Sequence, residues 1–275
     1  MHLDVHHLRD FYYRSQLGRA AQKALRDGLV ARWGAARGLT VAGYGFAAPL
    51  LRPFLAQAAR VMALMPGPQG VMHWPADGDN HSVLVDEARW PLANDSVDRL
   101  VMLHGLETSD RPLALMDEAH RVLAPQGRAV LVVPSRTGLW ARRDGTPFGF
   151  GRPWSRGQIE RTLADGGFTP VGHGAALFFL PSPRRFWLRM ARGLEQTGQR
   201  YAPERLGGVL IIEAIRSDAA PRRPGLRQAA RRPLAVLEGV PKGRAQPAWR
   251  SAGQGGSQAV RMWTLHQVID NNIYS

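Results

Sequence analysis

Residues 86–107 limit the possible folds of this chain more than any other segment. The segment begins with the adjacent carboxylates Asp86 and Glu87, passes through a Trp-Pro pair, and reaches an Asn-Asp-Ser cluster that favours a turn. The apolar run at residues 100–103 then predicts a buried strand that ends at His104. The chain therefore turns at its surface here and enters the interior as a strand.

Apolar runs alternate with helical patterns from residue 39 to residue 216. The expected strands are residues 39–42, 60–65, 83–85, 100–103, 128–133, 168–179 and 208–216. The expected helices between them are residues 48–59, 111–123, 154–166 and 183–193. Such alternation is typical of βαβ units in a mostly parallel sheet. We therefore predict an α/β, Rossmann-like fold with a seven-stranded, mostly parallel sheet and helices on both faces.

An amphipathic helical pattern precedes the first strand. Apolar residues recur at three- and four-residue steps across residues 5–33, with Arg and Gln between them. We expect one N-terminal helical segment that packs beside the sheet.

A Gly-rich turn follows the first expected strand. Gly43 and Gly45 flank Tyr44 immediately before the next helix. Glycines between a strand and a helix let a ligand approach the backbone closely, because no Cβ blocks it. A ligand site at this edge of the sheet is therefore expected.

The acidic segment and the Gly turn together resemble class I S-adenosylmethionine (SAM) dependent methyltransferases, in particular those with a type 11 methyltransferase domain. The resemblance covers residues 40–167 and extends more loosely to residue 216. It includes residues 117–128, which are similar to the family's E-x-x-R-V-L-x-P-G-G stretch. The resemblance implies SAM as the cofactor and an antiparallel final strand.

The resemblance also implies roles for particular residues. Gly43, Tyr44 and Gly45 would contact the methionine end of SAM. Asp86, followed by Glu87, would accept a hydrogen bond from the adenine amino group. His104, at the end of the fourth strand, would lie beside the SAM sulfur and contact the cofactor. His104 is also the candidate catalytic residue, acting as a general base. The alternative for His104 is that it merely ends the strand.

Two positions depart from the family pattern. Val41 and Met65 stand where the family has an acid at the end of the first and of the second strand. Loss of a charge-assisted contact to a ligand hydroxyl costs roughly 1.5–3 kcal/mol. The insert after the second strand contains four residues that could replace the ribose contact: His73, Trp74, Asp77 and Asp79. The alternative is that each of them is a surface-loop residue without a ligand contact.

Composition limits the partners and the compartment. The formal net charge is +14, which favours acidic partners, although an Arg-rich genome would give the same balance. There are no cysteines, so disulfides and thiolate chemistry are excluded. No secretory signal and no run of about 18 apolar residues is visible. We therefore expect a cytoplasmic protein without an integral membrane segment.

The chain divides into three expected parts. Residues 1–38 form the N-terminal helical segment, residues 39–216 the methyltransferase-like domain, and residues 217–275 a basic tail rich in Pro, Gly and Arg. That composition is typical of disorder. The tail is a candidate for weak contact with nucleic acid or an anionic membrane surface.

The helix expected at residues 183–193 mixes cations with large apolar groups. Arg184 and Arg185 precede Phe186 and Trp187, and Arg189 follows them. Such a helix suits an anionic membrane surface or RNA. The alternative is that it packs its aromatic residues inward and exposes its arginines.

The resemblance favours a SAM-dependent methyltransferase acting on an unidentified, small-molecule acceptor. The missing acids favour a second interpretation, in which the chain is an inactive methyltransferase-fold protein that serves as a binding or regulatory partner. A third interpretation, nucleic-acid binding, lacks a recognisable RNA module. The sequence also lacks the Asn/Asp-Pro-Pro-aromatic run of base-modifying methyltransferases after the fourth strand.

Overall fold

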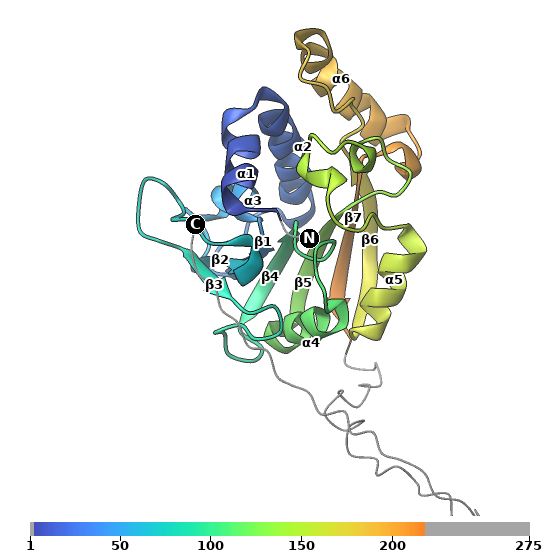
Figure 1. Ribbon diagram of the computed structural model, residues 1–275. Helices are drawn as coiled ribbons and strands as arrows, with labels where there is room; N and C mark the ends of the chain where they lie inside the picture. Colours follow the sequence, from blue (N-terminus) through green and yellow to red (C-terminus); the bar gives the residue numbers. More distant parts are fainter. Residues whose placement is uncertain (1–2, 218–275) are drawn as a thin grey trace, which may run out of the picture. The chain divides into compact units, whose positions relative to one another are not determined.

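The computed structural model describes residues 3–217 (Figure 1). The N-terminal segment is three pieces rather than one helix: α1 (Val5–Arg9), the π-helical turn η1 (Asp10–Arg14) and α2 (Gln16–Trp33). The break falls at Ser15, whose hydroxyl accepts a hydrogen bond from the Gly18 amide at 2.8 Å and donates one to the Phe11 carbonyl at 2.8 Å. Ser15 is therefore an N-cap that starts a new helix, which ends the expected continuous helix at residue 14.

The sheet has seven strands in the order β3-β2-β1-β4-β5-β7-β6. Their bounds are β1 (Thr40–Gly45), β2 (Arg60–Pro66), β3 (Ser82–Val85), β4 (Val97–Leu103), β5 (Leu123–Pro134), β6 (Phe168–Ala176) and β7 (Val209–Arg216). Strands β1 to β5 pair in parallel, whereas β7 lies antiparallel between β5 and β6. The predicted Rossmann-like, mostly parallel sheet is confirmed.

The remaining helices follow the strands with shifted ends. They are α3 (Ala48–Leu51), η2 (Arg52–Phe54), η3 (Gly67–Gln69), α4 (Pro112–Val122), η4 (Trp140–Arg142), η5 (Pro147–Gly149), α5 (Arg156–Asp165), α6 (Arg185–Tyr201) and η6 (Glu204–Leu206). The helix expected at residues 48–59 is much shorter, because Pro53 lacks the amide that would continue α3. In contrast, α6 runs eight residues beyond its expected end at residue 193.

Two apolar clusters cover the two faces of the sheet. Val41, Val101 and Val130 face the cluster that α2 and α3 complete. Ala42 and Leu100 face the opposite cluster, which α4 and α5 complete. Neighbouring residues of one strand point to opposite faces, so β1 contributes to both clusters. Helices therefore cover both faces, as Figure 1 shows.

The predicted tail at residues 218–275 lies outside the described residues. Within residues 3–217, the structure contains no helix with the length and apolar character needed to cross a bilayer.

Candidate functional site

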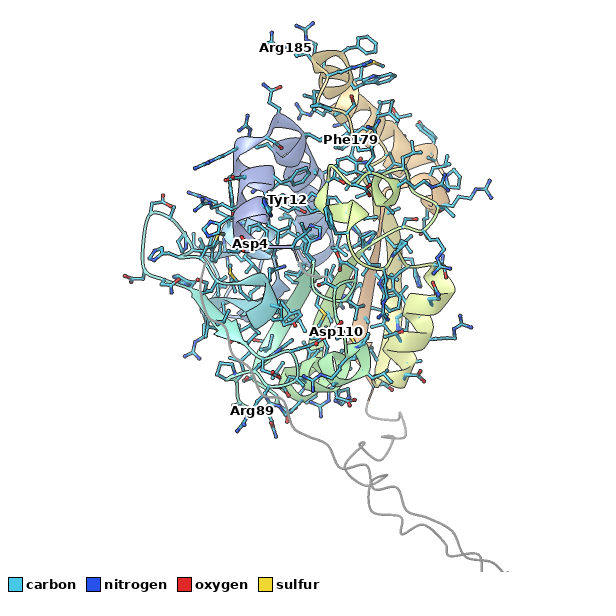
Figure 2. All side chains as sticks on the ribbon, in the orientation of Figure 1. Asp4, Tyr12, Arg89, Asp110, Phe179 and Arg185 are labelled. Atoms are coloured by element: carbon cyan, nitrogen blue, oxygen red, sulfur yellow. The ribbon has the colours of Figure 1, made fainter. Side chains whose placement is uncertain are left out.

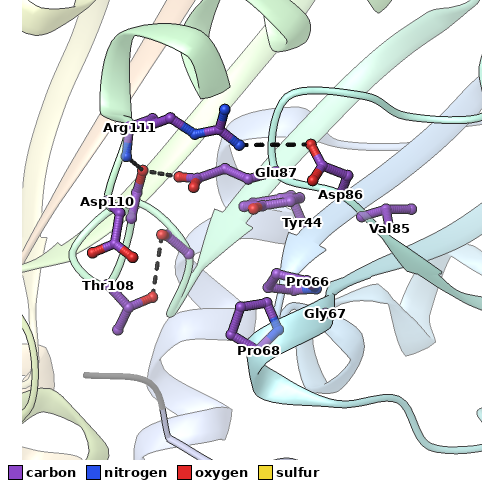
Figure 3. Close-up of a pocket in the computed structure, with 12 residues that line it drawn as sticks. Tyr44, Pro66, Gly67, Pro68, Val85, Asp86, Glu87, Thr108, Asp110 and Arg111 are labelled. Carbon is purple, nitrogen blue, oxygen red and sulfur yellow. Dashed lines mark hydrogen bonds and ion pairs between the residues drawn. The ribbon is translucent and has the colours of Figure 1, made fainter.

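A pocket of about 210 Å³ opens at the carboxyl ends of β1, β2, β3 and β4 (Figure 3). Its walls come from these strand ends and the loops that follow: Tyr44, Pro66, Gly67, Pro68, Val85, Asp86, Glu87, Gly105, Thr108, Ser109, Asp110 and Arg111. Ligands of open α/β sheets bind at this edge. The volume is below the roughly 300–1,000 Å³ typical of pockets for drug-sized ligands. The pocket therefore has room for part of a dinucleotide-sized ligand.

Tyr44 forms an aromatic wall of this pocket. Its buried ring stacks on Trp90 at 5.0 Å between centroids and 23° between planes. Burial, with the nearby charges of Glu87 and Asp86, raises the pKa of the Tyr44 hydroxyl far above its ordinary value. Gly105 is required beside it, since a Cβ there would lie 2.6 Å from the Tyr44 ring. The wall is therefore neutral and fixed in place.

Two carboxylates stand beside this ring. The side chain of Asp86 is 62% exposed, and its Oδ1 accepts the Ala88 amide at 2.9 Å. Arg111 Nη2 lies 3.8 Å from the same oxygen. The Ser109 hydroxyl donates to Glu87. An aromatic wall beside carboxylate acceptors suits a planar heterocycle that carries N–H or O–H donors.

The topological switch point of the sheet lies between β1 and β4, where ligand binding is expected in such sheets. Buried side chains of this protein occupy that place. Phe46 follows β1, His104 follows β4, Tyr12 comes from η1 and Phe148 from η5. Tyr12 stacks on Phe46 at 5.7 Å, and His104 lies 4.8 Å from the Phe148 ring. We call these four residues the switch-point cluster.

A buried hydrogen-bond chain runs through the switch-point cluster. The Tyr12 hydroxyl lies 2.7 Å from His104 Nε2, and His104 Nδ1 lies 3.0 Å from Glu107 Oε1. All three residues are at most 2% exposed. Burial first, and then the charge of Glu107, raises the Tyr12 pKa well above its usual value. Because the Glu107 carboxylate only accepts, we assign the imidazole proton to Nδ1, and Nε2 then accepts a hydrogen bond from the protonated Tyr12 hydroxyl.

Two buried acceptor atoms beside this hydrogen-bond chain have no hydrogen-bond partner among the described residues. They are Glu107 Oε2 and Gln69 Oε1. Gln69 is itself held in place, because its Nε2 donates to the His104 carbonyl at 3.1 Å. Unpaired buried polar atoms are uncommon, and a catalytic role or a bound water is among their explanations.

The structure brings only some of the predicted site residues to the pocket. Tyr44, Asp86 and Glu87 line it, whereas Gly43, Gly45 and His104 do not. A Cβ at Gly43 would lie 2.7 Å from Ala47 Cβ, and one at Gly45 would lie 2.3 Å from the Leu103 carbonyl oxygen. Packing within the chain therefore accounts for both glycines without a ligand.

The two missing acids have no substitute in the insert after β2. Val41 and Met65 are fully buried. Asp77 instead contacts Arg52 at 3.4 Å, and His73 Nε2 contacts the Gly78 carbonyl at 3.0 Å. Neither they nor Trp74 and Asp79 line the pocket.

Sequence reasoning missed several residues of the site. The polar run from Thr108 to Arg111 lies in the loop after the buried strand β4, and this position was the available signal. The sequence placed Tyr12 only in the apolar pattern of the N-terminal helical segment, and nothing in it indicated the contact with His104, 92 residues later in the chain. Among the described residues, the structure contains no group of side chains able to hold a metal ion.

Comparisons with known proteins agree with the fold. Residues 40–131 match a family described as a methyltransferase domain. No curated protein sequence matches the chain. Among solved structures, it is similar to the complex between the Haloferax volcanii Trm112 methyltransferase activator and the putative methyltransferase, with 17% identity over 76% of this chain and 97% of that chain and a TM-score of 0.53.

A second similar structure is a SAM-dependent methyltransferase from Thermotoga maritima, described as a possible histamine N-methyltransferase. It is 14% identical over 77% of this chain and 95% of that chain, with a TM-score of 0.53. A SAM-dependent methyltransferase from Aquifex aeolicus is 16% identical over 78% and 98%, with a TM-score of 0.50. At these identities the likeness shows the fold.

Proposed function

We propose that the methyltransferase domain of this chain binds SAM and transfers its methyl group to a small-molecule acceptor. The observation that carries the proposal is the pocket at the carboxyl ends of β1 to β4, lined by Tyr44 and Asp86, within a segment that matches the methyltransferase family. A cytoplasmic location remains a prediction from the sequence.

The pocket fits the nucleoside part of SAM. Tyr44 forms part of the apolar wall of the pocket beside the adenine, and Asp86 offers an acceptor for the adenine amino group. Met65 offers no acceptor for the ribose hydroxyls, and the carboxylates left in the pocket wall are Glu87 and Asp110. We assign the role of the missing acid at the end of β2 to Glu87, whose carboxylate accepts the Ser109 hydroxyl.

The methionine part of SAM does not fit while the switch-point cluster is closed. Tyr12 and Phe148 cover His104, which is 1% exposed. Binding of the whole cofactor therefore requires η1 to move away from the end of β4. Such a movement would also free His104 Nε2, which in the closed arrangement accepts a hydrogen bond from the Tyr12 hydroxyl.

SAM supplies an activated methyl group on a sulfonium when bound. His104 Nε2, once free, could accept a proton from the acceptor's nucleophilic atom. Glu107 accepts a hydrogen bond from Nδ1–H, which favours the tautomer in which Nε2 is the acceptor.

A second candidate function is an inactive methyltransferase-fold binding protein. The closed switch-point cluster favours it, since Tyr12, His104 and Glu107 satisfy one another without a ligand. The buried Val41 and Met65 at the two acid positions favour it as well.

Calorimetric titration with SAM and with S-adenosylhomocysteine separates the two candidates. We expect micromolar binding that weakens about ten- to a hundredfold in Asp86→Ala, as expected for loss of a hydrogen bond to a charged acceptor. Asp79→Ala is the matched control, because Asp79 is exposed and does not line the pocket. Folded protein that binds neither ligand at millimolar concentration would contradict the methyltransferase proposal and favour the binding protein.

A further inference from the structure

The first turns of α6 expose apolar side chains among arginines. Phe186 is 63% exposed and Met190 42% exposed, and their spacing of four places them on the same side of the helix. The Trp187 ring contacts Phe186 edge-on, with 5.1 Å between centroids. Arg185, at the start of α6, lies at the tip farthest from the sheet (Figures 1 and 2). We call residues 184–192 the α6 tip.

The alternative in which this helix packs its large side chains inward does not hold for Phe186 and Met190. The buried side of α6 consists of Ala191, Glu195 and Gly198. Glu195 fastens the helix to the preceding loop, because its carboxylate accepts the amides of Leu177 at 3.0 Å and Phe178 at 2.7 Å. Phe186 and Met190 therefore lie on the solvent-exposed side of a helix whose opposite side is anchored to the protein.

The α6 tip carries only positive charge. Residues 183–194 contain four arginines and no acid, and the next carboxylate, Glu195, is buried. These arginines are Arg184, Arg185, Arg189 and Arg192. Within residues 3–217, no carboxylate forms an ion pair with the guanidinium group of any of them. All four are exposed. Their charge is therefore available to an anionic partner.

We propose that the α6 tip docks onto an anionic lipid surface. Phe186 and Met190 insert among the acyl chains near the headgroups, and the arginines contact lipid phosphates. Single-stranded RNA fits less well, because it favours several flat rings along a basic groove. The α6 tip instead offers one exposed ring, Phe186, beside the half-buried Trp187 ring and the flexible thioether of Met190, on a projecting helix end.

Sedimentation of the full chain with lipid vesicles tests the proposal. The probes are vesicles of phosphatidylcholine alone and of phosphatidylcholine with phosphatidylglycerol at about three to one. We expect binding to the anionic vesicles only. Arg185→Gln/Arg189→Gln should weaken it, at about fivefold for each arginine near an anionic surface (~1 kcal/mol). Phe186→Ser/Met190→Ser should weaken it at least about tenfold, since both side chains lose their apolar burial.

The matched control is Tyr201→Ser/Leu206→Ser, which removes two apolar side chains that are 74% and 61% exposed outside the α6 tip. It should bind as the unchanged protein does. Residues 218–275 are present in every protein compared, so their charge does not distinguish the variants. Thermal unfolding checks that each variant is folded. No SAM is added, so the result is independent of the proposed methyl transfer.

The proposal is wrong if Phe186→Ser/Met190→Ser binds anionic vesicles as well as the unchanged protein does, because charge alone then carries the binding. Failure of the unchanged protein to bind vesicles overturns it too. Binding of an RNA oligonucleotide that the same double variant abolishes, without vesicle binding, would assign the α6 tip to RNA instead.

Discussion

Replacing Tyr12 by Phe removes one hydroxyl from a fully buried position. That hydroxyl donates to His104 Nε2 at 2.7 Å, and both residues are at most 1% exposed. Without it, Nε2 stays buried and loses its partner. An unsatisfied buried acceptor costs about 1–3 kcal/mol, so the free energy of unfolding should fall by that amount. For a domain of this size, that corresponds to a fall of about 2–12 °C in Tm.

Urea unfolding followed by circular dichroism measures this change. Tyr201→Phe is the matched control, because it removes the same hydroxyl from a side chain that is 74% exposed. We expect it to change the free energy by less than about 0.5 kcal/mol. Equal stability of the Tyr12 and Tyr201 variants would refute the reasoning, because the hydrogen bond to His104 would then contribute nothing.

The same substitution has a second readout in ligand binding. If binding of the methionine part of SAM requires Tyr12 to move away from His104, part of the free-energy cost of that movement is breaking the hydrogen bond between them. The variant lacks this hydrogen bond and so does not have this part of the cost. The affinity for SAM should therefore rise by about 5- to 150-fold, which is the same 1–3 kcal/mol. Unchanged or weaker affinity, together with the expected loss of stability, would show that η1 does not obstruct the cofactor.

Two further predictions concern the scaffold. Gly45→Ala should destabilise the fold by more than Gly34→Ala, because both glycines have positive φ but only the Cβ at residue 45 would strike the Leu103 carbonyl; equal losses in urea unfolding would contradict this. Burial opposes ionisation of Glu118, but hydrogen bonds from Arg121 and the Trp90 amide outweigh it and lower the Glu118 pKa below its ordinary 4.5. The stability from this group is therefore present above pH 4.5 and is lost as the pH falls through the lowered pKa. Glu118→Gln should be less stable at pH 7 and lose less stability on acidification, and parallel stability–pH curves would oppose the assignment.

The sequence predicted the sheet because its strands are short apolar runs bounded by Gly, Pro and Asp. Tyr44 and Asp86 could be placed for the same reason, since each lies at the carboxyl end of a predicted strand. The end of α3 was missed, although Pro53 marked it. Local sequence patterns therefore predict the positions of residues that directly follow or end a strand.

The switch-point cluster could not be predicted in this way. Tyr12 lies on a π-helical turn, whose sequence has the same apolar spacing as an ordinary helix. Its contact with His104 depends on how α1 and α2 pack over the sheet, which involves residues far apart in the chain. The inference that His104 faces the SAM sulfur therefore came from the resemblance alone.

A chain of rings joins the α6 tip's supporting loop to the switch-point cluster. Trp140 Nε1 donates to the Phe179 carbonyl at 2.8 Å, and the Trp140 ring meets both Phe179 and Phe148 edge-on at 5.3 and 5.4 Å. Phe148 in turn contacts His104. Linkage between two binding sites is reciprocal in equilibrium affinity. If binding of a lipid surface at α6 changes the affinity for a ligand that displaces Phe148, the effect is mutual. Binding of that ligand then changes the affinity for the lipid surface by the same factor.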